Sequence, residues 1–157
     1  MNRKNTGFTL VEILIVVIIL GILAAIVIPQ FTEASNDARV SAVISDLQTV
    51  RSQVELYKIQ HLDVLPGILG AAAWSPTTFK TQLTTKTNNL GAAGGTLGPY
   101  LQKFPVNPFC ADANTGATVV AVAADPGAVV TGGAGWWFNT VTGYCGVNTL
   151  KYDLLKK

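Results

Sequence analysis

The sequence of 157 residues carries little charge, with 13% of its residues being Asp, Glu, Lys or Arg, about half the fraction in a typical soluble chain. It also contains one His, one Met and two Cys. The low charge and the net charge of +2 argue against a disordered chain and against a nucleic-acid-binding protein, which needs a basic surface. The scarcity of His and Cys nearly excludes a zinc site built from several such ligands.

Much of the apolar content lies in one uninterrupted run near the N-terminus. A chain of this length makes one domain, or one domain with an appendage. From Leu10 to Ile28 the sole charged residue is Glu12, and a helix of this length spans roughly 28 Å, close to the hydrocarbon thickness of a bilayer. A buried core helix is the alternative, but a small domain rarely surrounds a helix that is apolar on every face. The run therefore predicts a membrane-spanning helix.

A short basic leader precedes this run. Arg3 and Lys4 are its charged residues, and such a segment keeps the N-terminus in the cytoplasm while the following chain crosses the membrane. An ordinary secretory signal has the same polarity, but its apolar region is shorter and ends at a small-x-small cleavage site. Here Ala25 is followed by three bulky apolar residues, and a signal peptide has no use for Glu12. The pattern favours a retained membrane helix.

The junction between leader and helix has a specific motif. Gly7-Phe8-Thr9-Leu10-Val11-Glu12, followed by an apolar helix with Gly21, Ala24-Ala25 and Pro29, resembles the class III signal of type IV pilins and type II secretion pseudopilins. The resemblance is dense over residues 7–30 and continues as a helix to about residue 60. It implies that a prepilin peptidase cuts between Gly7 and Phe8 and that Phe8 is then N-methylated. Removing residues 1–7 lowers the basic count from 11 to 9 against 9 acidic residues, so the net side-chain charge of +2 falls to zero.

Glu12 lies one helical turn after the new N-terminus. The resemblance implies that its carboxylate pairs with the Phe8 ammonium of the same or a neighbouring subunit, which would set the axial register of a filament. Burying an unpaired charge among apolar helices costs on the order of several kcal/mol. The carboxylate of Glu12 therefore requires a positively charged partner in a filament core. The alternative is an interfacial Glu that reaches water.

The second half of the helix differs from the first. Pro29 lacks a backbone N–H and is expected to kink or loosen the helix near residues 25–29, a region that the resemblance associates with a helix-to-extended transition in filaments. Beyond it, apolar residues recur at helical spacing on one face. These are Val40, Val43, Leu47, Val50, Val54 and Tyr57. We expect this stripe to dock against the chain's own C-terminal domain; a coiled coil is the alternative, with fewer than three heptads to support it.

The remaining chain predicts a small, sparsely charged β-rich head. Residues 64–149 contain five charged side chains, and 63–67 include the Pro-Gly pair that ends the helix. We expect a short helix at 78–84, a loop at 91–99, strands at 118–123 and 128–131, and a hairpin formed by 135–139 and 143–148. The segments 98–108 and 135–143 resemble the head of major pseudopilins.

The expected fold is therefore α+β and pilin-like, a long N-terminal helix packed on a small antiparallel sheet. We divide the chain into a cleaved leader (1–7), a transmembrane and filament-core helix (8–29), an amphipathic helix (30–62) and a globular head (63–157).

The two cysteines, Cys110 and Cys145, are expected to form a disulfide. Their count is even, and an exported head lies in a compartment where a bridge persists; two free thiols are the alternative. The loop between them gives a stabilisation of about 3–4 kcal/mol in the chain-entropy model. The pair resembles the C-terminal disulfide of many type IV pilins.

Major pseudopilins often bind calcium near the C-terminus, and this head has few residues for such a site. The weak candidates are Asp112, Asp125 and Asp153, too few for the six to eight oxygen ligands that calcium takes. We therefore expect no cofactor, with calcium as the remaining possibility.

Other distinctive residues have structural interpretations. Alternating core packing explains Trp136, Trp137 and Phe138 better than a carbohydrate or electron-transfer site. His61, which follows the apolar stripe, is expected to be structural rather than a ligand.

No catalytic constellation accompanies these features. We therefore expect a structural subunit of a pilus-like filament rather than an enzyme: a major pseudopilin of a type II secretion-like system or, alternatively, a major type IV pilin. A membrane-anchored binding protein that does not polymerise is a further alternative. The resemblance implies copies of itself, a prepilin peptidase, an inner-membrane assembly platform and minor pilins or pseudopilins as partners, with the N-terminus cytoplasmic and the head periplasmic, and later a periplasmic or cell-surface filament.

Overall fold

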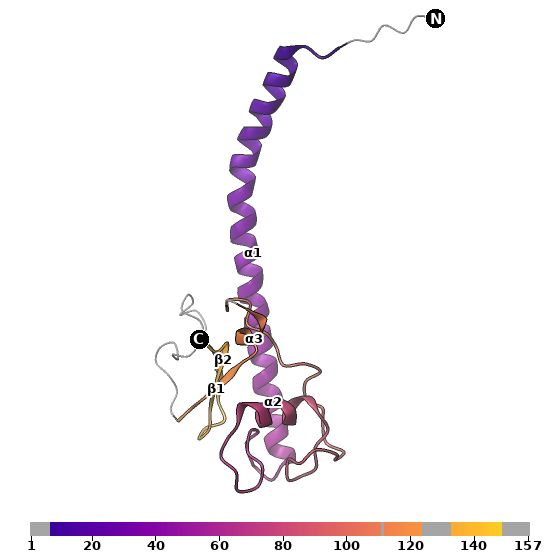
Figure 1. The fold of residues 1–157 in the computed structure, drawn as a ribbon, viewed down its shortest axis with the longest axis vertical. Coiled ribbons are helices and arrows are strands. Elements are labelled where there is room, and N and C mark those ends of the chain that lie inside the picture. The colour runs from indigo at the N-terminus through magenta and orange to yellow at the C-terminus, as the bar shows by residue number, and fades with distance from the viewer. Residues whose placement is uncertain (1–6, 111, 124–132, 149–157) are drawn as a thin grey trace, which may run out of the picture. The chain divides into compact units, whose positions relative to one another are not determined.

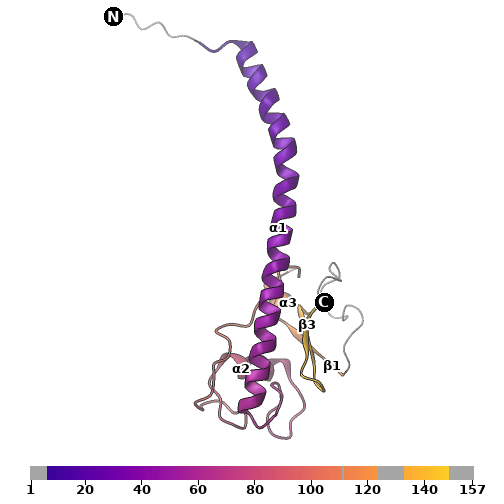
Figure 2. The same ribbon diagram turned by 180° about the vertical axis from the view of Figure 1, so that it is seen from behind.

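The computed structural model describes residues 7–110, 112–123 and 133–148. The chain divides into two compact units, Met1–Val40 and Ser41–Lys157. The long helix α1, Leu10–Gln60, contributes residues to both units. The boundary therefore falls within the predicted amphipathic segment 30–62, whose second part belongs to the head. Figures 1 and 2 show the order of the elements along the chain from two sides.

The first unit contains the N-terminal part of α1. The run from Leu10 to Ile28 contains no Ser, Asp or Asn, the residues whose side chains compete for backbone hydrogen bonds and disfavour a helix interior. The helix continues through Pro29, so residues 25–29 are helical here. The kink or loosening expected at Pro29 stays a prediction.

In the second unit, α1 supplies one side of the hydrophobic core. Its buried residues are Val43, Leu47, Val50, Val54 and Tyr57, five of the six residues of the predicted stripe. The sixth, Val40, is half-buried and belongs to the first unit. Leu47, Val50, Val54 and Tyr57 pack against aromatic and apolar side chains from the rest of the head, which confirms that the amphipathic part of the helix docks on its own C-terminal domain.

The helix α2, Pro76–Thr84, begins two residues before the predicted start. Ser75 is extended, with φ −135° and ψ 132°, and its side chain accepts a hydrogen bond from the Thr78 N–H. Proline is tolerated in the first turn because its missing N–H would have had no helical partner. Phe79 and Leu83 are the apolar residues that α2 buries in the core. A four-residue helix, α3, spans Ala113–Gly116.

The sheet has three strands in the order β1-β2-β3. β2, Trp136–Asn139, and β3, Cys145–Val147, form the predicted antiparallel hairpin, with Trp136 opposite Val147. β1, Val119–Val122, lies parallel to β2, with Val119 opposite Trp136. The expectation of an antiparallel sheet was therefore wrong: the sheet is mixed.

The connection between β1 and β2 explains this arrangement. It covers residues 123–135, long enough for the crossover that a parallel pair requires, whereas a tight turn would have made the pair antiparallel. The strand expected at 128–131 lies outside the described residues.

Aromatic side chains fill the space between α1, α2 and the sheet. The ring centroids of Phe79 and Phe138 are 4.7 Å apart, and Trp74 stacks on Phe138 at 5.7 Å. Trp136 and Phe138 are buried, while Trp137 on the opposite face of β2 is half-buried. This alternation confirms core packing as the role of the Trp-Trp-Phe run, and the pilin-like α+β expectation is confirmed with it.

Candidate assembly site at the helix N-terminus

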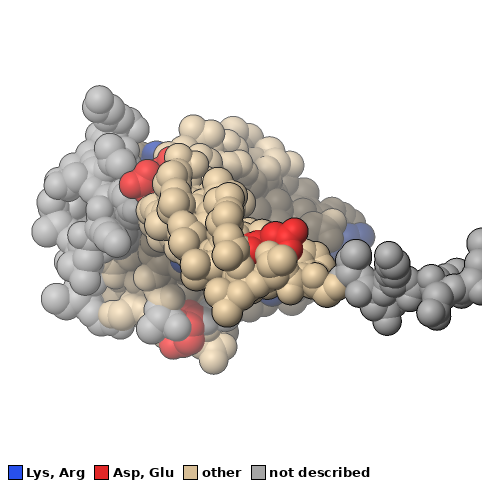
Figure 3. Space-filling view, turned by 90° about the horizontal axis from the view of Figure 1, so that it is seen from above, with Lys and Arg blue, Asp and Glu red and all other residues tan. Residues whose placement is uncertain are grey.

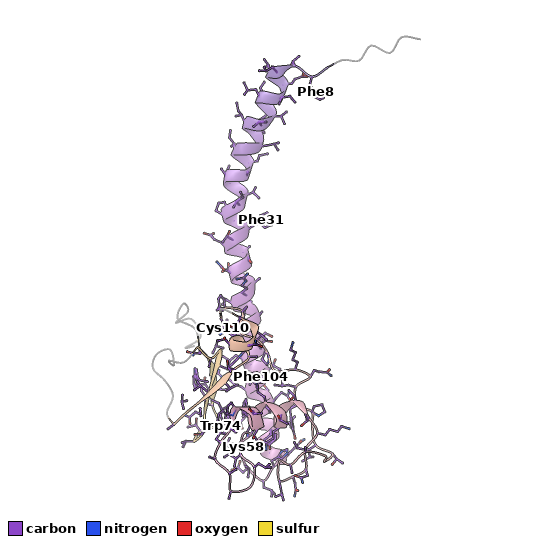
Figure 4. All side chains as sticks on the ribbon, viewed as in Figure 1. Phe8, Phe31, Lys58, Trp74, Phe104 and Cys110 are labelled. Atoms are coloured by element: carbon purple, nitrogen blue, oxygen red, sulfur yellow. The ribbon has the colours of Figure 1, made fainter. Side chains whose placement is uncertain are left out.

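The N-terminal half of α1 presents a continuous apolar surface. An 18-residue window of this helix has a mean hydropathy of 3.3, and none of it is buried in the monomer. Phe8, just before the helix, is 81% exposed, and Phe31 is also exposed (Figure 4). An exposed apolar surface much larger than the few hundred Å² of a typical monomer marks a membrane or protein interface. The segment is long and apolar enough to cross a membrane.

Thr9 and Glu12 form a capping box at the N-terminus of this helix. The Glu12 backbone N–H donates to Thr9 Oγ1 at 3.2 Å, while the Thr9 backbone N–H donates to Glu12 Oε2 at 2.9 Å. The Thr9 hydroxyl donates to the same carboxylate oxygen at 2.9 Å. This reciprocal pattern satisfies two N–H groups that have no partner within the helix. The sequence interpretation missed Thr9, although Thr-x-x-Glu before an apolar run is the signal for this motif.

The geometry leaves Glu12 able to do two things. Both Thr9 bonds end on Oε2, so Oε1 can accept from a second donor such as an N-terminal ammonium. The negative charge also lies in the first turn of α1, where the helix dipole favours an anion. A single carboxylate can therefore cap its own helix and accept from a second, positively charged donor at once.

Two glycines in this part of the chain have no intramolecular reason to be glycine. A Cβ built at Gly7 or at Gly21 meets no atom within 4 Å, and neither has the positive φ at which glycine is favoured. The space beside the backbone at both positions is therefore open in the monomer.

The structure places Cys110 and Cys145 as free thiols, so the predicted disulfide is absent from it. Cys145 is 2% exposed and belongs to the hydrophobic core, whereas Cys110 is half-buried. Burial raises the pKa of the Cys145 thiol to about 11, against the opposing effect of the nearby Arg51 guanidinium. Burial and the charge of Asp112 raise the pKa of Cys110. The disulfide stays a prediction.

Thiol labelling of the folded head checks this description. A thiol with a pKa near 11 is ionised to only about one part in ten thousand at pH 7, and the thiolate is the reactive form. In the reduced, folded protein we expect iodoacetamide to label Cys110 before Cys145, with the rates converging in denaturant. Digestion and mass spectrometry measure both rates, and equal labelling in the folded state would contradict the burial of Cys145. The same experiment without reductant reports the disulfide, because bridged cysteines are not labelled at all.

The carboxylate of Asp112 is engaged in hydrogen bonds within the head. Its two carboxylate oxygens accept from the backbone N–H and the hydroxyl of Thr115, at 2.8 and 2.7 Å, and these bonds lower its pKa. Asp125 and Asp153 lie outside the described residues. Within the ranges that the structure describes, no group of three or more His, Cys, Asp or Glu side chains could hold a metal ion.

His61 is part of the core, as expected. It is buried, stacks on Tyr57 with ring centroids 3.7 Å apart, and its Nδ1 lies 2.8 Å from the Tyr57 carbonyl oxygen. A carbonyl can only accept, so Nδ1 donates to it, and Nε2 is hydrogen-bonded to the Thr87 hydroxyl at 2.9 Å. Both ring nitrogens are thus committed to holding α1 against the loop that contains Thr87.

Comparison with known proteins agrees with this site. The model of the prokaryotic N-terminal methylation motif matches residues 2–28. The type II secretion system core protein G of Pseudomonas aeruginosa is 32% identical over 110 residues, which cover 69% of this chain and 70% of that protein. The core protein G of Vibrio cholerae is 30% identical over 68% of this chain and 67% of its own length.

A fimbrial protein is similar over the same extent. The type IV major fimbrial protein FimA of Dichelobacter nodosus is 34% identical over 107 residues, covering 68% of this chain and 66% of that protein. No solved structure matches the chain. Taken with the capped apolar helix and the small mixed sheet, these similarities show that the chain belongs to the family of type IV pilins and type II secretion pseudopilins.

Proposed function

We propose that this chain is the repeating structural subunit of a pilus-like filament, the major pseudopilin of a type II secretion-like system. The observation that carries the proposal is the apolar N-terminal half of α1, none of whose most apolar window is buried in the monomer. Such a surface needs a bilayer before assembly and the helices of other subunits after it. The relatives named as type II secretion core protein G support this assignment.

Processing at the leader prepares the helix for assembly. A prepilin peptidase cuts between Gly7 and Phe8, and Phe8 is then N-methylated, in agreement with the methylation motif over residues 2–28. The cut leaves a positive ammonium at the exposed Phe8, beside the capping box of Thr9 and Glu12. The leader's Arg3 and Lys4 hold the N-terminus in the cytoplasm until then, and the head lies in the periplasm.

Glu12 determines the axial position of the neighbouring subunit in the filament. In a core of packed apolar helices the carboxylate has no water, and the Phe8 ammonium of a neighbouring copy supplies the compensating charge. Because all copies present the same two groups at the same end, this ion pair determines the axial register. The partners are therefore copies of this chain, together with the peptidase, an inner-membrane assembly platform and minor pseudopilins.

Figure 3 shows few charged atoms among uncharged ones on the face it draws, and the blue Lys and Arg atoms there do not form a continuous tract. A nucleic-acid-binding surface usually presents such a basic tract. We propose no enzymatic activity and no cofactor. Calcium binding at the C-terminal acidic residues is the one cofactor possibility that the family raises.

The FimA relatives favour one second candidate, a major type IV pilin. Deleting the gene separates the two functions. If the chain serves secretion, its deletion should stop the export of proteins to the medium, and if it is a major pilin, its deletion should remove surface fibres. Loss of surface fibres with unchanged secretion would therefore assign the chain to the pilins.

The mature N-terminus tests the processing step. We expect intact-mass spectrometry to show a chain that begins at N-methylated Phe8, and we expect Gly7→Val to leave an uncut precursor in the membrane, because the added branches block close approach to the backbone. Gly21→Ala is the matched control and should be cut normally, since it lies well inside the helix. A mature chain that begins at any other residue would refute the proposed cut.

A further inference from the structure

One face of α1 just beyond the apolar run changes from apolar to polar and then to cationic. A groove of about 410 Å³ lies along this face, and all the residues that line it belong to the first unit, Met1–Val40. They recur at spacings of three and four, as residues on one helical face do. The lining residues are Ile28, Phe31, Thr32, Ser35, Asn36 and Arg39. We call these six residues the Arg39 groove.

The apolar end of the Arg39 groove continues the membrane-spanning segment. Ile28 is the last residue of the apolar run, and Phe31, labelled in Figure 4, is 72% exposed about one turn later. The Thr32 hydroxyl donates to the Ile28 carbonyl at 3.3 Å, so its proton faces the helix rather than a ligand. This end of the groove therefore suits the acyl chain of a lipid.

The cationic end of the groove gathers hydrogen-bond donors. Ser35 and Asn36 lie four and three residues before Arg39, so the three side chains are neighbours on the helix surface. Within the part of the chain that the structure describes, none of them has a hydrogen-bond or ion-pair partner. A guanidinium donates but cannot accept, and the amide and the hydroxyl add further donors. The ligand that matches this set is a negatively charged acceptor, such as a phosphate.

The neighbouring acidic side chains lie on other faces of α1. Glu33 and Asp37 precede Arg39 by six and two residues, which places them about 120° and 160° from it around the helix. The groove itself has one positive charge and no negative one. Its guanidinium therefore stays available to an anion from outside the chain.

The position of Arg39 along the helix matches the headgroup layer of a bilayer. Arg39 follows Phe31 by eight residues, about 12 Å along the helix axis, and the headgroup layer on each side of the hydrocarbon is about 5–7 Å thick. The side chain of a helical residue leans toward the N-terminus, here toward the membrane, and the usual tilt of a spanning helix shortens the distance further. With Phe31 at the edge of the hydrocarbon, the guanidinium therefore reaches the phosphates.

We propose that the Arg39 groove binds an anionic phospholipid. Its phosphate accepts from Arg39, Asn36 and Ser35, and its acyl chain lies along the apolar end of the groove. The headgroup is anionic rather than zwitterionic, because choline or ethanolamine would bring a second cation to a groove that already holds a guanidinium. The bound lipid holds the subunit at one depth in the membrane before assembly. The proposal rests on the membrane stage of the proposed function and adds a ligand to it.

Lipid retention in native mass spectrometry tests the ligand. The full chain is extracted from membranes in a mild detergent and given an equimolar mixture of phosphatidylglycerol and phosphatidylcholine with the same acyl chains. We expect the wild type to retain phosphatidylglycerol preferentially, and Arg39→Gln to lower the ratio of the two lipids about fivefold, the effect of one basic side chain at an anionic surface. The leader's Arg3 and Lys4 are present in both proteins, so their attraction for anionic lipid cancels in this comparison.

Two control variants separate a built site from charge in general. Lys103→Gln removes one positive charge from an exposed position of the head and should leave the lipid ratio unchanged. Asn36→Ala retains every charge and removes one donor, so it should lower the ratio about threefold, as the loss of one hydrogen bond does. A ratio that follows net charge, falling equally in Arg39→Gln and Lys103→Gln but not in Asn36→Ala, would overturn the proposal. An unchanged ratio in Arg39→Gln would also overturn it.

Hydrogen exchange in lipid nanodiscs measures the same contact without detergent. We expect the backbone amides of residues 32–39 to exchange more slowly in phosphatidylglycerol than in phosphatidylcholine, because the bound headgroup covers this face of the helix. Arg39→Gln should remove the difference between the two lipids, whereas Lys103→Gln should retain it. Equal exchange of the wild type in both lipids would contradict the proposed site.

The outcomes distinguish this proposal from the proposed function. If alkaline extraction releases the wild-type chain from membranes, the proposed function fails at its membrane stage and the lipid site fails with it. If the chain stays in the membrane and forms filaments that depend on Glu12, but its lipid ratio does not depend on Arg39, the lipid site is wrong and the proposed function stands. Loss of filaments in Arg39→Gln with an unchanged lipid ratio would assign the groove to a contact between subunits instead.

Discussion

Replacing Glu12 with glutamine is expected to abolish filament assembly while leaving the helix N-terminus capped. Glutamine retains the oxygen that accepts from the Thr9 N–H and hydroxyl, and it is an accepted residue at this position of a capping box. What it loses is the negative charge. An ammonium of a neighbouring Phe8 would then be buried without a counter-charge, which costs about 3–5 kcal/mol for each subunit interface.

Thr9→Ala is the matched counterpart of this substitution. It removes the capping hydroxyl but retains the carboxylate, so it frays the first turn at a cost of about 0.5–2 kcal/mol. We therefore expect Thr9→Ala chains to form filaments and Glu12→Gln chains to form none, although both insert into the membrane and are cut at Gly7. Glu12→Ala, which loses cap and charge together, should resemble Glu12→Gln.

Electron microscopy of sheared filaments and fractionation of the membrane measure the two steps separately. Normal assembly of Glu12→Gln with loss of assembly in Thr9→Ala would show that Glu12 acts through the cap. In that result the charge pair would be wrong, and the capping box would be the functional feature of the motif.

Gln82→Glu is expected to destabilise the head by about 4 kcal/mol, as large as the loss of a core side chain. Gln82 is buried in α2 and joins two loops: its Oε1 accepts from the Gly67 N–H at 2.7 Å, and its Nε2 donates to the Ile68 and Gly91 carbonyls at 2.9 and 3.1 Å. Glutamate has nearly the same shape but no donor. Its charged oxygen would face two carbonyl oxygens in a buried site.

The pH dependence of this variant has a definite sign. Burial and the two carbonyls favour the protonated carboxyl, so they raise the pKa of a glutamate at position 82 in the folded state above its value in the unfolded chain. The folded state then binds more protons than the unfolded state, and stability falls as the pH rises through this raised value. The variant should be most stable in mild acid, where its carboxyl can donate to one carbonyl.

Chemical denaturation of Gln82→Glu at several pH values measures this effect. Gln102→Glu is the control, because Gln102 is exposed, and it should change stability by no more than about 0.5 kcal/mol. A Gln82→Glu head that matches this control at neutral pH would contradict the hydrogen-bonding role assigned to Gln82.

The sequence predicted the features that depend on local patterns. The apolar run, the amphipathic stripe of α1 and the hairpin around Thr140–Thr142 follow from periodicity and turn residues, and the structure has each of them. The capping box is equally local, because it depends only on the spacing of Thr9 and Glu12 along the chain, and it was not predicted. The buried role of Gln82 has no local signature at all.

The sequence by itself determined that this chain has an apolar N-terminal helix, an amphipathic continuation and a sparsely charged head, because side-chain periodicity depends only on neighbours along the chain. The tertiary structure decided that β1 lies parallel to β2. It also decided that Cys145 is buried, with the Arg51 Nε donating to the Cys145 carbonyl at 2.9 Å. Leu62 is exposed and has a left-handed backbone conformation. These features join residues far apart in the sequence or depend on what the fold leaves uncovered. Only the tertiary fold determines these features.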